Sequence, residues 1–439
     1  MYRIVSKLLM YGDMPKDSIL MQLSGIFKDL DNGTVPKDEL TIRVYTQIKH
    51  LLQVATDYAF DKNLWQNYLT FLLITDENPF SLTCEKVGAN DGSVNAFAKA
   101  DFAAFMELFH FDFSRIEREL GIDVFSRITN YRSIVKKELM YNKNVSEKVR
   151  ALSEKLALAK DETEFFQCVT GFYHDYGVGM FGLNKAFRLA GTGDSLRFQA
   201  INNMDTVMLD DLVGYEIQKK QLVENTEAFV SGRKANNVLL FGDSGTGKST
   251  SIKAIVNQFY GRGLRMIEIY KHQFQDLSNV IARIKNRNYR FIIYMDDLSF
   301  EEFEIEYKFL KAVIEGGVET RPENILIYAT SNRRALIRET WGDRSDMEHD
   351  GDIHRSDTME EKLSLSSRFG LQIFYPAPTF DEYQGIVSAL FRRTGAGSLT
   401  DEELRKAAAT WQVRAGSRSG RTARQFVDAL ACKTQTEGK

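Results

Sequence analysis

The residues with the clearest chemical meaning lie in one short, glycine-rich segment. Residues 242–249 read Gly-Asp-Ser-Gly-Thr-Gly-Lys-Ser, which fits the pattern G-x-x-x-x-G-K-[ST] without a mismatch. In such a segment the glycines let backbone N–H groups turn inward toward an anion, and the following helix N-terminus favours negative charge. The pattern predicts a nucleotide phosphate-binding loop formed by Gly242, Asp243, Ser244, Gly245, Thr246, Gly247, Lys248, Ser249 and Thr250.

Two carboxylates and an amide are spaced to complete the chemistry of such a loop. Lys248 is expected to reach the β- and γ-phosphates of ATP, and Ser249 to bind Mg²⁺. Asp296 and Asp297 follow an apolar run; we expect Asp296 to hold the same Mg²⁺ and Asp297 to orient an attacking water. Asn332 follows another apolar run, and its amide is expected to reach the γ-phosphate or the water.

These side chains need elements that bring them together. An apolar strand at 237–241 precedes the loop, and helical spacing over 250–260 follows it. The alternation of strand and helix then continues, which predicts a five-stranded parallel sheet with helices on both faces. Ligands of such sheets lie at the carboxyl ends of the strands, where the polar residues stand. The four further strands are expected at 265–269, 291–295, 324–330 and 371–375.

Residues 1 to about 190 predict a mainly helical domain. Within residues 41–59 the apolar side chains repeat at helical spacing, and Asp101 is expected to cap another helix. The isolated histidines and the aromatic stripes are more typical of packing than of a cofactor pocket. Residues 191–194, Gly-Thr-Gly-Asp, are expected to be linker and not a second phosphate loop, because no apolar strand precedes them and no lysine follows.

Composition excludes several classes of protein. The net charge is −3, which provides no general attraction to nucleic acid or to an anionic membrane. The three cysteines are far apart and form no C-x-x-C pair, which favours a reducing compartment over a disulfide framework or a zinc site. No apolar run is long enough to span a bilayer, so the expected location is the cytoplasm.

Further segments resemble the AAA+ ATPases. Residues 211–215, Asp-Leu-Val-Gly-Tyr, look like the segment that those proteins place beside the adenine, which implies contacts from Val213 and Gly214. Asn332 matches their sensor 1. Arg368, in Ser-Arg-Phe-Gly at 367–370, matches their arginine finger, and Arg424, in a Gly-Arg-Thr-Ala-Arg-Gln-Phe segment, matches their sensor 2.

A narrower resemblance comes from residues 360–370, Glu-Glu-Lys-Leu-Ser-Leu-Ser-Ser-Arg-Phe-Gly. They are similar to a bacterial AAA+ group catalogued as a domain of unknown function, number eight-fifteen. The resemblance implies a helical N-terminal domain at 1–195 that recognises a protein partner, an α/β nucleotide-binding domain at 205–377 and a small helical lid at 378–439. It also implies ATP and Mg²⁺ as ligands, and a homo-oligomer in which Arg368 acts on a neighbour's nucleotide.

Two departures from the AAA+ pattern affect the expected activity. Where those proteins usually carry Asp-Glu, this chain has Asp296 and Asp297, and the shorter side chain is expected to slow hydrolysis or to need help from Glu301 or Glu302. The stretch at 270–276 lacks the glycine of the pore loops of protein unfoldases. The missing glycine disfavours a protein unfoldase without excluding it. The substitution at Asp297 keeps a second function open, in which the protein is a nucleotide-gated adaptor or loader with little hydrolysis.

Two charged segments leave other ligands open. The loop at 342–357 is rich in Asp, His and Arg and is expected to be a solvated insertion, with a metal site as the alternative. The lid is locally basic, which leaves contact with DNA open. A small-molecule kinase is disfavoured, because no second substrate site is evident in the α/β core.

Overall fold

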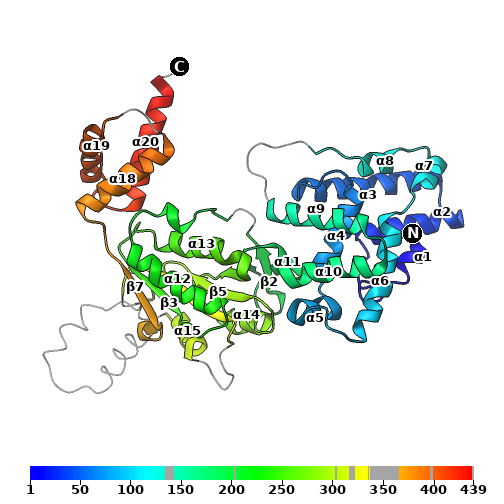
Figure 1. Ribbon diagram of the computed structural model, residues 1–439, viewed down its shortest axis with the longest axis horizontal. Coiled ribbons are helices and arrows are strands. Elements are labelled where there is room, and N and C mark those ends of the chain that lie inside the picture. Colours follow the sequence, from blue (N-terminus) through cyan, green and yellow to red (C-terminus); the bar gives the residue numbers. More distant parts are fainter. Residues whose placement is uncertain are drawn as a thin grey trace. The chain divides into compact units, whose positions relative to one another are not determined.

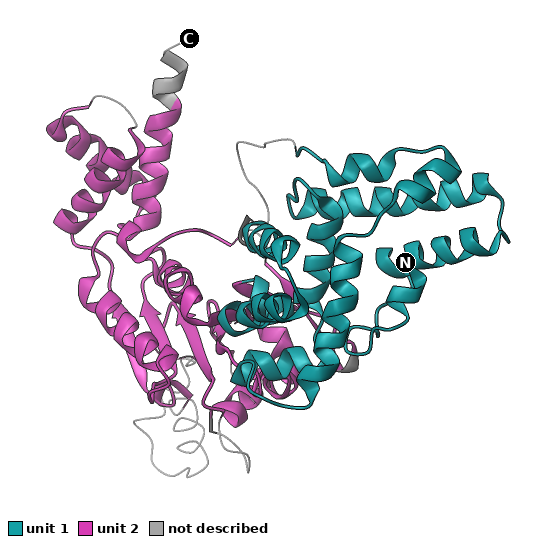
Figure 2. Cartoon of the chain, turned by 45° about the vertical axis from the view of Figure 1, so that its right-hand side comes forward, with its two compact units in different colours: residues 1–184 teal, residues 185–439 magenta. Residues whose placement is uncertain are grey.

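The chain divides into two compact units, Met1–Asn184 and Lys185–Lys439 (Figure 2). The computed structural model describes residues 1–133, 143–201, 204–301, 304–315, 322–334, 336, 365–395 and 399–437. Glu302 and the loop at 342–357, both named above, lie outside these residues. Among the described helices, none has both the length and the hydrophobicity needed to cross a bilayer.

The first unit consists of helices, as the sequence predicted. Serine and asparagine caps start several of them: the Ser18 side chain accepts the backbone N–H of Met21, and Asn63 accepts that of Gln66. The helices shown in Figure 1 are α1 Tyr2–Val5, α2 Ile19–Asn32, α3 Lys37–Asp57, α4 Leu64–Thr75, α5 Pro79–Val87, α6 Val94–Phe109, α7 Ser114–Leu120, α8 Val124–Thr129, α9 Lys143–Leu158, α10 Glu162–Tyr176 and α11 Gly179–Leu183.

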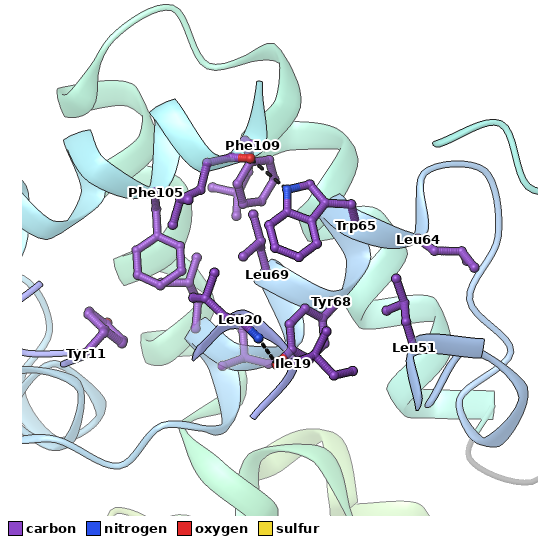
Figure 3. Packing of buried hydrophobic residues seen from close by; sticks show 14 of the residues in the cluster. Tyr11, Ile19, Leu20, Leu51, Leu64, Trp65, Tyr68, Leu69, Phe105 and Phe109 are labelled. Atoms are coloured by element: carbon purple, nitrogen blue, oxygen red, sulfur yellow. Dashed lines mark hydrogen bonds between the residues drawn. The ribbon is translucent and has the colours of Figure 1, made fainter. Parts of the chain in front are cut away.

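Aromatic and aliphatic side chains fill the core of this unit (Figure 3). The polar atoms of the buried aromatics find backbone partners: the Trp65 indole N–H donates to the carbonyl oxygen of Leu108 at 2.7 Å, and the Tyr68 hydroxyl accepts the N–H of Leu20 at 3.3 Å. Burial without such partners would cost free energy. The aromatic stripes therefore serve packing, as expected.

The expected role of Asp101 was wrong. Asp101 lies in the middle of α6 and not at its start, and it is 1% exposed. Its carboxylate accepts the backbone N–H groups of Leu9 and Tyr11 at 2.9 and 3.0 Å. The residue caps a turn of the N-terminal segment from a distance, a role that a local capping rule cannot foresee.

The second unit is built on a seven-stranded sheet with the order β2-β1-β4-β5-β6-β3-β7. Five of its strands coincide with those expected: β3 Val238–Gly242, β4 Leu264–Glu268, β5 Arg290–Met295, β6 Ile325–Ser331 and β7 Leu371–Tyr375. All neighbouring pairs among these five are parallel. Strand β3 lies between β6 and β7, so the phosphate-loop strand has a neighbour on each side.

The sheet has two strands more than the five expected. β1 Ala186–Ala190 pairs in parallel with β4, and β2 Arg197–Ala200 pairs antiparallel with β1. Residues 191–194 connect the two as part of a hairpin, so they are not a linker between domains. β2 escaped notice because it has four residues and is half-exposed, with polar residues at alternate positions, unlike the apolar runs of buried parallel strands. In β1, Arg188 interrupts the apolar run.

Helices cover both faces of the sheet. α12 Glu216–Val230 and α13 Lys248–Phe259 share one core with side chains from β3 to β7. α14 Leu277–Ile284 connects β4 to β5, and α15 Glu306–Glu315 connects β5 to β6. These connections cross the sheet in the direction opposite to the connection from β3 to β4. Right-handed crossovers therefore place α14 and α15 on the face opposite to α13. Short 3-10 helices occur at Gly193–Ser195, η2 Leu209–Asp211, Tyr260–Arg262 and η4 Lys271–Asp276.

Three helices after β7 form a small bundle with its own core (Figure 1). They are α18 Phe380–Thr394, α19 Asp401–Ala415 and α20 Gly420–Glu437. Thr379 and Thr400 begin the first two with capping boxes, and glycines in the left-handed conformation end them. This bundle is referred to below as the lid.

Candidate functional site

The loop between β3 and α13 approaches two other elements so closely that only glycine fits. Gly242 has φ +134°, and a Cβ atom there would lie 2.1 Å from the carbonyl oxygen of Tyr375 on β7. Gly245 has φ +77°, and its Cβ would lie 2.8 Å from Oγ of Ser419, just before α20. The glycines of the sequence pattern thus let the loop wrap between the sheet and the lid.

Lys248 opens helix α13 and is held in place by backbone. Its ammonium group donates to the carbonyl oxygens of Gly242 at 2.8 Å and Asp243 at 2.6 Å, and to Oδ1 of Asn332 at 3.1 Å. The residue is 6% exposed. Burial lowers the pKa of the lysine below its ordinary value, while Asp243, Asp296 and Asp297 act in the opposite direction. The cation is fixed at the point where the loop turns into the helix.

A hydroxyl and a carboxylate meet beside this lysine. Oγ of Ser249 donates to Oδ1 of Asp296 at 2.6 Å, and Oγ1 of Thr330 donates to the same oxygen at 2.6 Å. Burial raises the pKa of Asp296, but these hydrogen bonds outweigh it and leave the pKa below its ordinary value. A charged carboxylate next to a hydroxyl is a fitting oxygen donor set for Mg²⁺, which takes few protein ligands and completes its shell with phosphates and water.

Asp297 has an uncommon backbone conformation. Its φ is +51°, in the left-handed region that aspartate tolerates better than most residues. Two hydrogen bonds hold it: its N–H donates to Oγ1 of Thr330 at 2.9 Å, and its Oδ1 accepts Nδ2 of Asn332 at 2.8 Å. Asn332 therefore bridges Lys248 and Asp297. Strained backbone of this kind concentrates at functional sites.

All these side chains border one cavity of about 820 Å³ in the second unit. Its walls come from the loop, from the ends of β5 and β6, from the segment around η2 and from the lid. The lining residues named by the sequence analysis are Val213, Ser244, Gly245, Thr246, Gly247, Lys248, Ser249, Thr250, Asp296, Asp297, Asn332 and Arg424. Such a volume is in the usual range of small-molecule sites.

The lid contributes three arginines to this cavity, Arg393 from α18 and Arg421 and Arg424 from α20. Arg424, expected from the sequence, lines it, and so does Arg421 from the same segment. The backbone N–H of Arg421 donates to the carbonyl oxygen of Gly245 at 3.3 Å, so α20 begins directly against the phosphate loop. The charge of Arg421 also contributes to lowering the pKa of Lys248. Arg421 belongs to the segment that resembles sensor 2, in which Arg424 was the expected sensor residue, and its spacing of three from Arg424 places both on one helix face.

Apolar side chains from the segment around η2 and from the lid also line the cavity. Val213 lines it, whereas Gly214 does not and instead turns the chain with φ +81° into Tyr215. Tyr215 donates its hydroxyl to the carbonyl oxygen of Pro376 at 2.9 Å and stacks on Tyr375. Burial raises the pKa of Tyr215 to about 12, so it stays a neutral donor. Ile386 and Leu390 of the lid also line the cavity.

Several residues that were expected in the site do not line the cavity. Gly242 and Asp243 do not line it but supply the carbonyls that hold Lys248. Arg368, between Leu365–Ser367 and β7, does not line it either, and neither does Glu301. The segment after β4 forms η4, in which Phe274 is buried and Tyr270 is 42% exposed.

Comparisons with known proteins extend this description. A family model described as "Protein of unknown function (DUF815)" matches residues 183–434. Among solved structures, the chain is similar to the Thermotoga maritima RuvB Holliday junction branch migration motor, with 14% identity over 51% of this chain and 71% of that chain and a TM-score of 0.32. Two variants of that motor match with 15% and 14% identity, the same coverage and the same TM-score. No curated protein matches.

Proposed function

The chain belongs to the DUF815 family, in agreement with the narrower resemblance of its sequence, and from this premise we propose that it is a Mg²⁺-dependent ATPase of the AAA+ class. The observation that carries the proposal is the meeting of Lys248, Ser249, Asp296, Asp297 and Asn332 along one cavity. A phosphate loop by itself can serve binding alone. The two carboxylates and the bridging amide add what hydrolysis needs.

We propose that the triphosphate lies along the loop from Ser244 to Thr250. The backbone N–H groups of the loop and the start of α13 neutralise its charge, with Lys248 beside the outer phosphates. The base lies between Val213 and the lid residues Ile386 and Leu390. Ser249 and Asp296 would hold Mg²⁺, which would supply positive charge to stabilise the negative charge of the phosphates.

In this mechanism Asp297 orients the water that attacks the γ-phosphate and accepts its proton. Asn332 connects that carboxylate to Lys248 and is placed to contact the γ-phosphate. Arg421 and Arg424 carry positive charge from the lid to the same phosphates, so closing of the lid follows the state of the nucleotide.

Arg368 is proposed to act on a neighbouring subunit. Arg368 does not line the cavity of its own chain, which agrees with the trans-acting role that the AAA+ resemblance implies, in which the active form is a homo-oligomer. The helical N-terminal domain is proposed to recognise a protein partner, on which ATP hydrolysis acts; no feature of the described residues identifies that partner.

One observation favours a second function. Asp297 has a short side chain, a strained backbone and a hydrogen bond to Asn332, and each of these limits how freely its carboxylate can reach a water. A nucleotide-gated adaptor or loader, in which ATP binding is the switch and turnover is slow, would use the same cavity. Measured turnover with bound nucleotide separates the two functions.

The proposed site is tested by calorimetric titration of MgATP into the wild type and Lys248→Ala. We expect the variant to lose at least about tenfold in affinity, because a charged hydrogen bond is worth about 1.5–3 kcal/mol. Lys220→Ala, on the exposed surface of α12, is the matched control and should bind as the wild type does. Equal MgATP affinities in all three proteins would show that the phosphate loop does not bind the nucleotide.

A further inference from the structure

The first lid helix, α18, lines the cavity with residues of one face. Ile386, Leu390 and Thr394 are spaced by four residues along α18 and all line the cavity, as expected for one face of a helix. Val207 and Leu212 line the cavity from the segment around η2. A planar base fits between two such walls, provided that the distance between them is fixed.

Arg393 connects these two walls. Its guanidinium donates from Nη1 to the carbonyl oxygen of Asp211 at 2.9 Å and from Nη2 to that of Asp210 at 2.6 Å. The Asp211 carboxylate lies 3.6 Å from Nη1. The carbonyls at the end of a helix need partners outside it, and the planar fork of arginine suits two adjacent acceptors.

The acceptors of Arg393 belong to a segment that is anchored to the core. Leu209 of η2 is 7% exposed and packs with α13 in the core of the unit. Nδ2 of Asn257 on α13 donates to the carbonyl oxygens of Asp205 at 2.7 Å and Val207 at 2.9 Å. Arg393, which itself lines the cavity, therefore ties α18 to a fixed part of the sheet domain, whereas the contact between Arg421 and Gly245 ties α20 to the phosphate loop.

We propose that Arg393 is a positioning residue that holds α18 over the base end of the cavity and thereby sets how long a nucleoside triphosphate stays bound. It acts through the lid and takes no part in the chemistry at the phosphates. This inference rests on the proposed function, since it specifies how the same site retains its nucleotide.

The neighbouring residue provides a matched control. Arg392 is on the same turn of α18, its side chain is 73% exposed, and its nearest carboxylate, Asp401, lies 3.9 Å away. Arg392→Gln and Arg393→Gln remove the same charge and the same number of atoms, but only the second removes the tie to η2. Arg393→Lys keeps the charge and can satisfy one carbonyl better than two.

The experiment measures MgATP affinity by calorimetry, release of a fluorescent ATP analogue by stopped flow, and kcat and KM by phosphate release. Arg393→Gln should bind MgATP about tenfold more weakly, equivalent to about 1.4 kcal/mol, through faster release, with kcat within about twofold of the wild type. Arg393→Lys should lie between, and Arg392→Gln should match the wild type. Backbone hydrogen exchange in α18 should rise only in the Arg393 variants.

The outcomes separate the inference from the proposed function. A wild type that binds no MgATP would overturn the proposed function, and the inference with it. If the wild type binds and Arg393→Gln releases nucleotide at the same rate, the inference alone is overturned. A loss confined to kcat would also overturn it, because Arg393 would then act on the reacting phosphates. Equal melting temperatures of the two Gln variants exclude a general loss of folding.

Discussion

In the proposed function, hydrolysis depends on Asp297. Its carboxylate accepts a hydrogen bond from Asn332 at the cavity wall, and its backbone, two residues after the end of β5, has a φ of +51°. Asparagine tolerates this backbone region as well as aspartate does, so the charge can be removed without disturbing the turn. Glutamate would add reach, but it tolerates the left-handed region less well.

We predict that Asp297→Asn keeps MgATP affinity within about threefold while turnover falls at least about tenfold, because the amide cannot accept the proton of the water. Calorimetry and phosphate release measure the two effects. Asp297→Glu should raise turnover if the length of the side chain limits the rate. An unchanged rate in Asp297→Asn would move the role of base to another carboxylate, with Glu301 and Glu302 as the first to examine.

A second carboxylate, outside the site, makes stability depend on pH. Asp76 ends α4, and burial raises its pKa from an ordinary value of 3.8 to about 6, with Asp13, Glu77 and Asp101 adding to the shift. A raised pKa in the folded state means that the group stabilises the fold fully below pH 3.8, where it is protonated in both states. This contribution is lost as the pH rises through about 6.

We therefore predict that Asp76→Asn gains in melting temperature relative to the wild type as the pH rises from 4 to about 7, because the variant has no carboxyl group to ionise. Thermal unfolding at both pH values measures the difference. Asp91→Asn, at an exposed position, should show no such trend. A difference between Asp76→Asn and the wild type that is constant with pH would contradict the assignment.

At the scale of elements, the phosphate loop depends on close contact with the lid. Gly245 faces Ser419 and Arg421, and a Cβ atom there would lie 2.8 Å from Oγ of Ser419 and 3.1 Å from Cβ of Arg421. Because its φ is also positive, alanine at this position is strained in the loop and pushes against the start of α20.

Gly245→Ala is accordingly predicted to weaken MgATP binding at least about tenfold, since a positive φ alone costs an L-residue on the order of 1–2 kcal/mol. Gly261→Ala is the matched control, because a Cβ atom there meets nothing within 4 Å. Calorimetry on both variants measures the effect. Wild-type affinity in Gly245→Ala would show that the loop binds without this packing.

The sequence predicted those parts of the fold that depend on a pattern of apolar and polar residue types. Buried parallel strands are apolar runs, so β3 to β7 were recognised, whereas the half-exposed β2 was not. The residues expected on the strand ends and in most of the loop line one cavity, because their positions follow from those of the strands. Arg421 and Arg424 share a helix face, so spacing could not choose between them. The tie from Arg393 goes to backbone carbonyls, which every residue has, and it leaves no signal in the sequence.

At the scale of the whole molecule, the position of Arg368 bears on assembly. The residue precedes β7 and does not line the cavity of its own chain. An arginine supplied from another subunit stabilises the transition state of phosphoryl transfer, and in GTPases such a residue is worth about 10³- to 10⁵-fold in rate. The proposed oligomer would bring Arg368 to a neighbour's γ-phosphate.

We predict that Arg368→Ala binds MgATP but loses turnover, and that mixing it with inactive Lys248→Ala restores part of the activity. In the mixture, an intact loop in one chain meets an intact arginine in another. Activity per chain should rise with protein concentration, and light scattering should show oligomers with ATP. A monomer whose activity is independent of concentration, with no rescue in the mixture, would rule out action between subunits.

The most direct test of the central claim is phosphate release from ATP by the purified wild-type chain, with Mg²⁺ and with EDTA, beside Lys248→Ala. We predict that the wild type releases phosphate only with Mg²⁺, even if the release is slow, and that Lys248→Ala releases none above background. Release that is equal in the two proteins, or that persists without Mg²⁺, would contradict a site built from Lys248, Ser249 and Asp296.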